Sequence, residues 1–215
     1  MESGTTLVLV NGLWMTRRAL WPLRRRLRAR DLDVHIFSYP TVARDLRANA
    51  AALNDYLHSL PGDTVHLVGY SLGGLVIRAL FHDFPDQRPG RIVTLGTPHT
   101  GSHAARCAER WGWGRRIMGR GVADLLAGAP QHWTWPAHEL GAIAGDLGLG
   151  LGRLFGGLPK PHDGTVAVAE ACPPQATARR VLRVSHFGML LAPVVVDAVV
   201  DFLSQGRFVA ARERT

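Results

Sequence analysis

The residues best suited to chemistry in this chain lie at positions 69–73, which read Gly-Tyr-Ser-Leu-Gly. The preceding run from Thr64 to Val68 is typical of a buried strand, and the run from Leu72 to Phe81 is typical of a helix. Glycines on both sides of Ser71 permit a tight, strained turn that lifts the serine above the sheet. The backbone N–H of Leu72 points to where an oxyanion would form. Ser71 is therefore predicted to be a nucleophile.

A serine hydroxyl needs a histidine to take its proton and a carboxylate to hold that histidine. Asp163 lies in the turn sequence Pro-His-Asp-Gly, and His186 lies in Val-Ser-His-Phe-Gly, just past a strand-like run. In hydrolases built on this strand-turn-helix bend, the three groups follow in the order serine, acid, histidine. Ser71, Asp163 and His186 follow in that order, so we predict that they act together.

Other residues compete for the acid and the base. Asp146 directly follows a strand-like run and is the main rival of Asp163. His99 follows another predicted strand, and His162 adjoins the predicted acid. Neither of these histidines follows the acid at the end of a strand, so His186 is the favoured base.

Length and composition limit the number of domains and the class of protein. The 215 residues predict one domain, 1–215, that is large enough for a sizeable core. A hydrophobic content of 47% and a mean hydropathy of +0.03 indicate a globular chain. Cys107 and Cys172 are too few and too far apart to suggest a disulfide framework or a metal site. The chain starts without an export signal and has no bilayer-length apolar run, so we expect a cytoplasmic protein.

Short apolar runs alternate with helical patterns along the chain. One helical stripe joins Leu46 to Leu60, and another begins near Pro193 and stops at Gly206. This alternation predicts a parallel sheet covered by helices on both faces, with its ligand site beyond the carboxyl ends of the strands. The predicted strands are Leu7–Asn11, Val34–Tyr39, Thr64–Gly69, Arg91–Gly96, Leu140–Ala144 and Arg179–Val184.

One segment interrupts the alternation. Residues 98–136 are rich in Gly, Arg and Trp and contain a short helical pattern at Val122–Leu126. An insertion here, over about residues 100–137, is predicted to cover the site as a cap or lid. Its tryptophans could line an apolar acyl pocket, contact lipid or fill a satellite core. A Gly-rich stretch at 147–158 predicts a mobile loop before the acid turn. The tryptophans are Trp111, Trp113, Trp133 and Trp135.

The net charge of +8 and a pI near 10.8 raise the question of an anionic partner. Leu20, Leu23 and Leu27 recur at helical spacing, which predicts that the arginines around them occupy a solvated helix face. No nucleic-acid module or aromatic interleaving accompanies them, so we do not expect a nucleic-acid partner. Weak contact with an anionic membrane surface stays open. The arginines are Arg17, Arg18, Arg24, Arg25, Arg26, Arg28 and Arg30.

Together the motifs resemble those of small α/β-hydrolase fold lipases and esterases, particularly bacterial esterase-like proteins with a short cap. The resemblance covers nearly the whole chain and implies a three-layer α/β sandwich with about six mainly parallel strands. It rests on Val-Asn-Gly-Leu-Trp at 10–14, Val-Gly-Tyr-Ser-Leu-Gly-Gly at 68–74, Leu-Gly-Thr-Pro-His-Thr-Gly-Ser at 95–102, Asp-Gly-Thr-Val at 163–166 and Ser-His-Phe-Gly at 185–188.

The resemblance also implies roles for single residues. Ser71 would be the nucleophile, His186 the general base and later the acid, and Asp163 its orienting carboxylate. The Asp-Gly turn of the family motif favours Asp163 over Asp146. No metal or other cofactor is needed for this chemistry.

Backbone N–H groups of Leu13 and Leu72 would form the oxyanion hole, and Trp14, Tyr70 and His99 would contact the substrate. The chain departs from the family in two places. Many relatives have His-Gly after the first strand, where this chain has Asn-Gly at 11–12, and we expect the asparagine to support the loop. The first predicted strand, Leu7–Asn11, begins almost at the N-terminus, so we expect the sheet to lack the fold's first two antiparallel strands.

The expected activity is hydrolysis of a small-molecule carboxylic ester with an acyl or aromatic group, through an acyl-enzyme. Two alternatives stay open. The same three residues could serve thioester hydrolysis or acyl transfer, for which the basic surface suits an anionic carrier. A non-catalytic binding protein on a hydrolase scaffold is the other. The sequence leaves the oligomeric state open.

Overall fold

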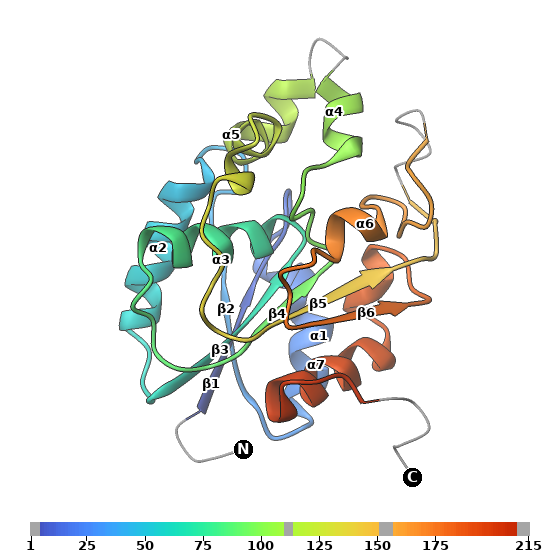
Figure 1. The fold of residues 1–215 in the computed structure, drawn as a ribbon. Helices are drawn as coiled ribbons and strands as arrows, with labels where there is room; N and C mark the ends of the chain where they lie inside the picture. The colour runs from blue at the N-terminus through green and yellow to red at the C-terminus, as the bar shows by residue number, and fades with distance from the viewer. Residues whose placement is uncertain (1–4, 110–113, 151–156, 210–215) are drawn as a thin grey trace.

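A computed structural model describes residues 5–109, 114–150 and 157–209, which form one open sheet between helical layers (Figure 1). The sheet has six strands, all parallel, in the order β2-β1-β3-β4-β5-β6. Every predicted strand is confirmed, and no end differs by more than two residues. The strands are β1 (Thr5–Val10), β2 (Asp33–Phe37), β3 (Thr64–Tyr70), β4 (Ile92–Leu95), β5 (Leu140–Gly145) and β6 (Ala178–Leu182).

Helices cover both faces of the sheet because successive strand residues point to opposite faces. Val8 and Val10 join the apolar cluster under α2 and α3, whereas Leu7 and Leu9 join the cluster under α1 and α7. None of the helices in the described ranges is long and apolar enough to cross a membrane. The α-helices are α1 (Trp21–Arg28), α2 (Leu46–His58), α3 (Leu72–Asp83), α4 (His103–Glu109), α5 (Gly114–Leu126), α6 (Val168–Ala171) and α7 (Pro193–Gln205), and the 3-10 helices include η1 (Arg17–Leu20), η2 (Ala129–Gln131) and η4 (Phe187–Leu190).

The arginine-rich helix follows its predicted pattern. In α1, Leu23 and Leu27 are fully buried against the sheet, and Arg25, Arg26 and Arg28 are exposed. The arginines thus occupy a solvated face, as the spacing predicts.

Helix ends also follow from local sequence. Helix α2 begins after Asp45, whose carboxylate accepts a hydrogen bond from the N–H of Ala48 at 2.7 Å. Helix α7 begins at Pro193 and ends before Gly206, which has a φ of 70°. Both ends of α7 are where the sequence places them.

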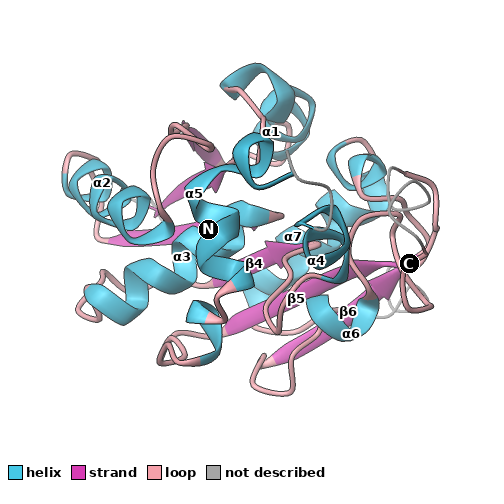
Figure 2. Cartoon of the chain, turned by 90° about the horizontal axis from the view of Figure 1, so that it is seen from above, coloured by secondary structure: helices cyan, strands magenta, loops and turns pink. Residues whose placement is uncertain are grey.

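The segment between β4 and β5 contains α4, α5 and η2, which lie beyond the carboxyl ends of the strands (Figures 1 and 2). Helix α5 is longer than the predicted Val122–Leu126 and contains a kink at Gly119, with a φ of 77°. The sequence pattern identified only the part of α5 after this kink. Trp111 and Trp113, and residues 151–156 of the Gly-rich stretch, lie outside the described residues.

The other two tryptophans fill core rather than an open pocket. Trp133 is buried, and Trp135 packs on the same apolar cluster. The guanidinium carbon of Arg78, on α3, lies 3.8 Å from the centre of the Trp135 ring, which is a cation–π contact. Of the three roles predicted for the tryptophans, core filling describes this pair.

Arg78 itself is 1% exposed and ties the two ends of the insertion to α3. Its Nη1 donates to the carbonyl of His99 at 3.1 Å, and its Nη2 donates to the carbonyl of Pro130 at 2.7 Å. Burial lowers the pKa of Arg78 to about 10, so the side chain stays charged at neutral pH. A buried cation thus joins the chain after β4 to η2, which lies between α5 and β5.

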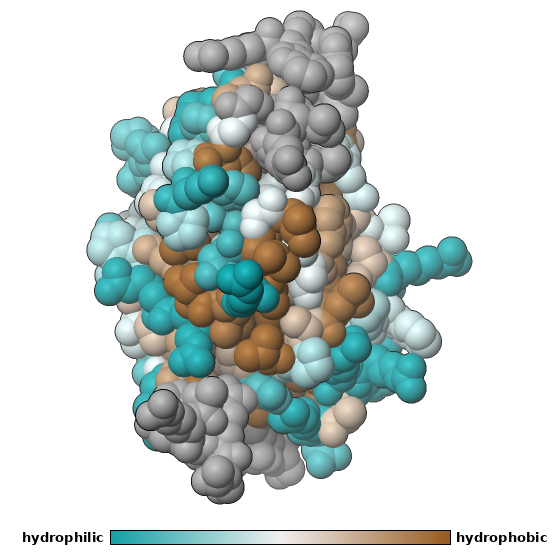
Figure 3. Space-filling view, turned by 90° about the vertical axis from the view of Figure 1, so that its right-hand side faces the viewer, coloured by the Kyte–Doolittle hydropathy of each residue, from teal (hydrophilic) through white to brown (hydrophobic). Residues whose placement is uncertain are grey.

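Apolar side chains also reach the surface beside the sheet's last strand. Val181, on the edge strand β6, is 44% exposed. Figure 3 looks at the right-hand side of the view in Figure 1 and shows a broad apolar area there, framed by hydrophilic side chains.

Helix α3 packs on the sheet at backbone-to-backbone distance. A Cβ on Gly69 would lie 2.5 Å from the Cα of Gly74, and one on Gly73 would lie 2.3 Å from the carbonyl oxygen of Val10. A Cβ on Gly74 would lie 2.1 Å from Oγ1 of Thr97. No side chain fits at these positions, because real Cβ atoms do not approach other atoms this closely.

We therefore predict that Gly69→Ala destabilises the fold by roughly 2–3 kcal/mol or more, because α3 must move away from β3. Urea unfolding followed by circular dichroism measures this change. Gly121→Ala is the matched control, since its Cβ would meet only Leu46 and Leu72 side-chain atoms at 3.4 Å or more. Because Gly121 lies in helix α5, alanine there should leave the unfolding free energy unchanged or raise it by up to about 1 kcal/mol. Equal effects of the two changes would contradict the prediction.

Candidate active site

The sheet order places a topological switch point between β1 and β3. From β1 the chain crosses to β2 on one side, and it returns to β3 on the other side of β1. The loops that follow β1 and β3 therefore leave in opposite directions at a topological switch point. Ser71 follows β3 directly, and a Cβ on Gly12, after β1, would lie 3.1 Å from the Cβ of Ser71. The two loops meet at the predicted nucleophile.

Ser71 has a strained backbone, with φ 52° and ψ −122°. A non-glycine residue in this conformation persists only where its surroundings hold it. The N–H of Ser71 donates to the carbonyl of Leu95 at 2.8 Å, and its own carbonyl accepts from Oγ1 of Thr97 at 2.9 Å. Leu72 begins α3, where backbone N–H groups have no partner within the helix. The bend thus places Ser71 at the N-terminal end of α3, next to the loop after β1.

Asp163 and His186 form a buried pair. Oδ2 of Asp163 lies 2.7 Å from Nδ1 of His186, and the two residues are 1% and 4% exposed. The other carboxylate oxygen accepts the N–H groups of Thr165 and Val166, each at 2.8 Å. The backbone N–H of His186 also donates to the carbonyl of Asp163, at 2.8 Å. Since the carboxylate engages Nδ1, the opposite ring nitrogen, Nε2, is the one left to exchange a proton with a nucleophile.

The other candidate acid and one other candidate base serve the loops. Asp146 is exposed, and its N–H donates to the carbonyl of Leu182 at 3.1 Å. Nδ1 of His162 accepts the N–H of Gly164 at 3.0 Å and so braces the acid turn. Within the described residues, the carboxylate that reaches His186 is that of Asp163.

Tyr70 requires a correction. It was predicted to contact the substrate, but it is 2% exposed. Its hydroxyl donates to the carbonyl of His186 at 3.1 Å, and its ring centre lies 5.0 Å from that of the imidazole. Burial, with a further contribution from the charge of Asp163, raises the pKa of the Tyr70 phenol, which keeps the hydroxyl protonated as a donor. Tyr70 holds His186 in place from within the core.

His99 requires the same correction. It is 1% exposed, its Nε2 lies 3.0 Å from Oγ1 of Thr94, and its ring packs on Trp135. Burial, helped by the charge of Arg78, lowers the pKa of His99 to about 3. His99 is therefore a neutral histidine enclosed in the core.

The loop after β1 is braced by polar side chains. Nδ2 of Asn11 donates to the carbonyls of Gly12 and Met15, at 3.1 and 3.0 Å. The N–H of Trp14 donates to Oγ1 of Thr41 at 3.1 Å. Asn11 is fully buried and supports this loop, as expected from the sequence. Thr41 was missed, because a single threonine in a loop carries no sequence signal, and the motif at 95–102 did not predict the contact of Thr97 with Ser71.

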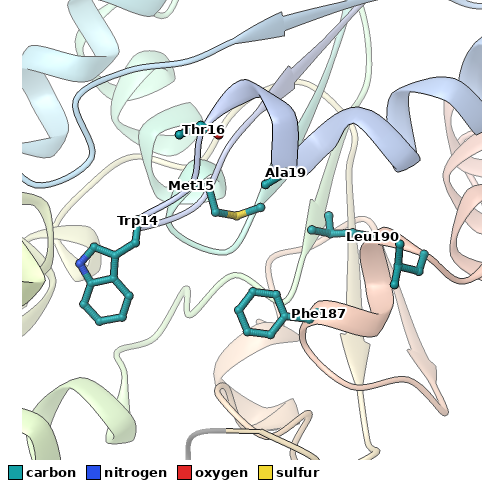
Figure 4. A pocket seen from close by; sticks show the side chains of 7 residues that line it. Trp14, Met15, Thr16, Ala19, Phe187 and Leu190 are labelled. Atoms are coloured by element: carbon teal, nitrogen blue, oxygen red, sulfur yellow. The ribbon is translucent and has the colours of Figure 1, made fainter.

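An open apolar cavity of about 340 Å³ lies between the β1 loop with η1 and the 3-10 helix η4 that follows His186 (Figure 4). Trp14 lies on one side of it, and the ring of Phe187 reaches across from the other. Trp14 was predicted to contact a substrate, and it is 54% exposed here. Sequence reasoning missed the other lining residues, whose apolar types alone match core. The lining residues are Trp14, Met15, Thr16, Ala19, Phe187, Leu190 and Leu191.

The open, all-parallel sheet with its serine at the bend after β3 is an α/β-hydrolase fold, and solved structures agree. The mature lipase BlEst2 of Bacillus licheniformis is similar, with a TM-score of 0.71 and 22% identity over 94% of this chain and 91% of that one. A metagenomic carboxyl esterase has a TM-score of 0.64 and 18% identity over 85% of this chain and 64% of that one. The thioesterase RedJ of Streptomyces coelicolor, from prodiginine biosynthesis, has a TM-score of 0.51 and 18% identity over 87% and 80%.

Within this fold, the chain belongs to the family described as Domain of unknown function (DUF7379), whose model matches residues 4–130. No curated protein matches the chain significantly. At the identities of the solved structures the likeness establishes the fold, and the activity has to be argued from the site.

Because His99 is buried and neutral, we predict that it makes the unfolding free energy depend on pH. Its folded-state pKa is about 3, against an ordinary value of 6.5. Between these values the unfolded chain binds one more proton than the folded chain, so the unfolding free energy falls as pH is lowered, by up to about 1.4 kcal/mol per pH unit. His99→Asn removes this term, so its loss of stability from pH 7 to pH 5 should be smaller than that of the wild type by about 2 kcal/mol.

Urea titrations at pH 7 and pH 5 measure the unfolding free energy of each protein at both values. Only the change between the two pH values is compared, so the stability of His99→Asn at pH 7 does not affect the test. His132→Asn is the control because His132 is exposed. It should show the same pH dependence as the wild type. An unchanged pH dependence in His99→Asn would contradict the neutral, buried state of His99.

Proposed function

We propose that this protein is a serine hydrolase that cleaves carboxylic esters through an acyl-enzyme. One observation carries the proposal. A strained Ser71 stands at the start of α3, on the same edge of the sheet as the buried Asp163–His186 pair. The lipase and esterase folds to which the chain is similar support it. A structural role alone would not require strain at Ser71 together with a buried charge on Asp163.

In the proposed first step, Oγ of Ser71 attacks the ester carbonyl while Nε2 of His186 takes its proton. Asp163, bound to Nδ1, keeps the imidazole in the tautomer that leaves Nε2 as acceptor, and it stabilises the imidazolium once formed. The hydroxyl of Tyr70 holds the backbone of His186 through its carbonyl, and the Tyr70 ring packs beside the imidazole. The pair needs no rearrangement, because three backbone N–H contacts already fix it.

The negative charge on the attacked oxygen would be stabilised by the N–H groups of Leu13 and Leu72 and by the N-terminal end of α3. His186 then gives its proton to the leaving alcohol, and the acyl group stays on Ser71. Water enters, loses a proton to His186 and attacks the acyl carbonyl. Return of that proton to Ser71 releases the acid and restores the site.

The substrate we propose is a small-molecule ester with an acyl chain or aromatic group. The cavity beside η4 is lined mostly by apolar side chains, and its wall begins at Phe187, next to His186. We also propose that the protein is a single domain in which residues 100–137 form a cap over the end of the sheet that carries the cavity. Arg17 and Arg18, exposed beside the cavity, favour a thioester of an anionic carrier as second candidate. Matched oxygen and thio esters distinguish the two.

We predict that Ser71→Ala lowers kcat on nitrophenyl esters by at least about a thousandfold, because no nucleophile remains. Fluorophosphonate labelling should disappear with it. Asp163→Asn should lose about 10²–10⁴ in kcat by disturbing the His186 tautomer. Ser204→Ala, on the exposed face of α7, is the control and should leave kcat and labelling unchanged. If the wild type shows neither turnover nor labelling, a binding role on an inherited fold replaces the proposal.

A second prediction concerns the cavity. Ala19→Trp should fill it and lower kcat/KM for long-chain nitrophenyl esters about tenfold or more relative to short-chain ones, because each methylene seated in an apolar pocket contributes to transition-state binding. Ala29→Trp, at the exposed end of α1, is the matched control and should leave the ratio unchanged. Equal ratios in all three proteins would mean that acyl chains bind elsewhere.

A further inference from the structure

Exposed apolar side chains concentrate around the cavity. Five of the eight large apolar residues that are exposed in the described chain lie in the segments 14–21 and 187–194. Trp14, Phe187 and Leu191 line the same cavity, and Trp21 and Val194 lie within three residues of lining residues Ala19 and Leu191. Monomeric proteins rarely leave such a cluster uncovered unless it binds something. The five are Trp14 (54% exposed), Trp21 (60%), Phe187 (58%), Leu191 (53%) and Val194 (42%).

The charges beside this apolar surface have one sign. Residues 11–30 include seven arginines and no acidic residue, and residues 187–194 carry no charge. Arg30 pairs with Asp197, and Arg24 donates to the carbonyl of Val34 at 3.0 Å. Within the described part of the chain, no carboxylate pairs with the remaining five, all exposed. These five are Arg17, Arg18, Arg25, Arg26 and Arg28.

Helix α1 presents its aromatic ring and two of these arginines on one side. Trp21, Arg25 and Arg28 follow at the i, i+4 and i+7 spacing that forms a single stripe along a helix. Leu23 and Leu27, which are fully buried, point the opposite way into the core. The stripe therefore faces outward as an indole flanked by guanidinium groups.

This combination fits a lipid surface. Tryptophan rings are favoured at the headgroup level of bilayers, apolar side chains enter the region beneath it, and arginines bind lipid phosphates. A protein partner would need hydrogen bonds, about one per 100–200 Å² of interface. The stretch 187–194, Phe-Gly-Met-Leu-Leu-Ala-Pro-Val, offers no side chain that could supply one, and apart from Thr16 and the two indoles the side chains of 14–28 that could are arginines, which bind phosphate. We propose that the segments 14–28 and 187–194 form a docking surface for bilayers of anionic phospholipid.

Vesicle flotation tests the docking surface independently of catalysis, because it is done with the full-length Ser71→Ala variant. Vesicles of phosphatidylcholine alone are compared with vesicles that also contain phosphatidylglycerol. We expect flotation with the anionic vesicles, loss of it at high salt and little with the neutral ones. Absence of flotation, or equal flotation with both vesicles, overturns the proposal and leaves the proposed hydrolase untouched.

Two variants locate the interaction. Arg25→Glu/Arg28→Glu should lower the partition coefficient roughly 25-fold or more, from about fivefold per arginine removed. Trp21→Ser should lower it several-fold at unchanged net charge. Arg44→Glu/Arg179→Glu changes two exposed arginines outside the docking surface by the same charge. Repeated with an intact Ser71, all three should leave turnover of a soluble nitrophenyl ester unchanged. An equal loss in the control pair would mean attraction by net charge alone, which also overturns the proposal.

Discussion

The contact between the first turn of α3 and strands β1 and β3 is the constraint on which the rest of the structure depends. Three backbones meet there with no room for a side chain at Gly69, Gly73 or Gly74. Because α3 cannot retreat, the chain between it and β3 must bend within one residue, and Ser71 takes up that bend as backbone strain. Close packing, rather than any property of the serine, decides where the hydroxyl stands.

A parallel sheet then brings distant residues to the same edge. Asp163 and His186 come from the chain on either side of β6, far along the sequence from Ser71. The strands end together, so turns that follow them become neighbours. Gly96, at the end of β4, leaves the necessary space, since a Cβ there would lie 3.0 Å from both Asp163 and the His186 ring. The pair can be fully desolvated because the surrounding backbone supplies its hydrogen bonds.

The parts of the fold and site that could be predicted from the sequence were those with a clear residue pattern. Most of the six strands are short apolar runs, as expected of buried parallel strands, and all six were found. The Asp163–His186 contact followed from residue order. The burial of Tyr70 and His99 could not be predicted from the sequence. Both residues lie in motifs near the site, but a motif does not tell whether a side chain points into the core or toward a substrate. The wall of the cavity was missed since residues such as Ala19 and Leu190 are of the same types as core. Helix α5 was shortened in the prediction because its kink at Gly119 breaks the periodicity.

Arg78 gives the insertion between β4 and β5 a closed base. One guanidinium holds the carbonyl of His99 on one side and that of Pro130 on the other, so the two ends stay together whatever lies between them. The entropy of closing a loop grows slowly with its length, and here a buried contact already fixes the ends. Exposed residues between His99 and Pro130 can therefore change without moving β4 or β5, whereas buried ones such as Met118 and Val122 pack on the core. Variation in this family should accumulate inside that loop, and Arg78 should change only together with its acceptors.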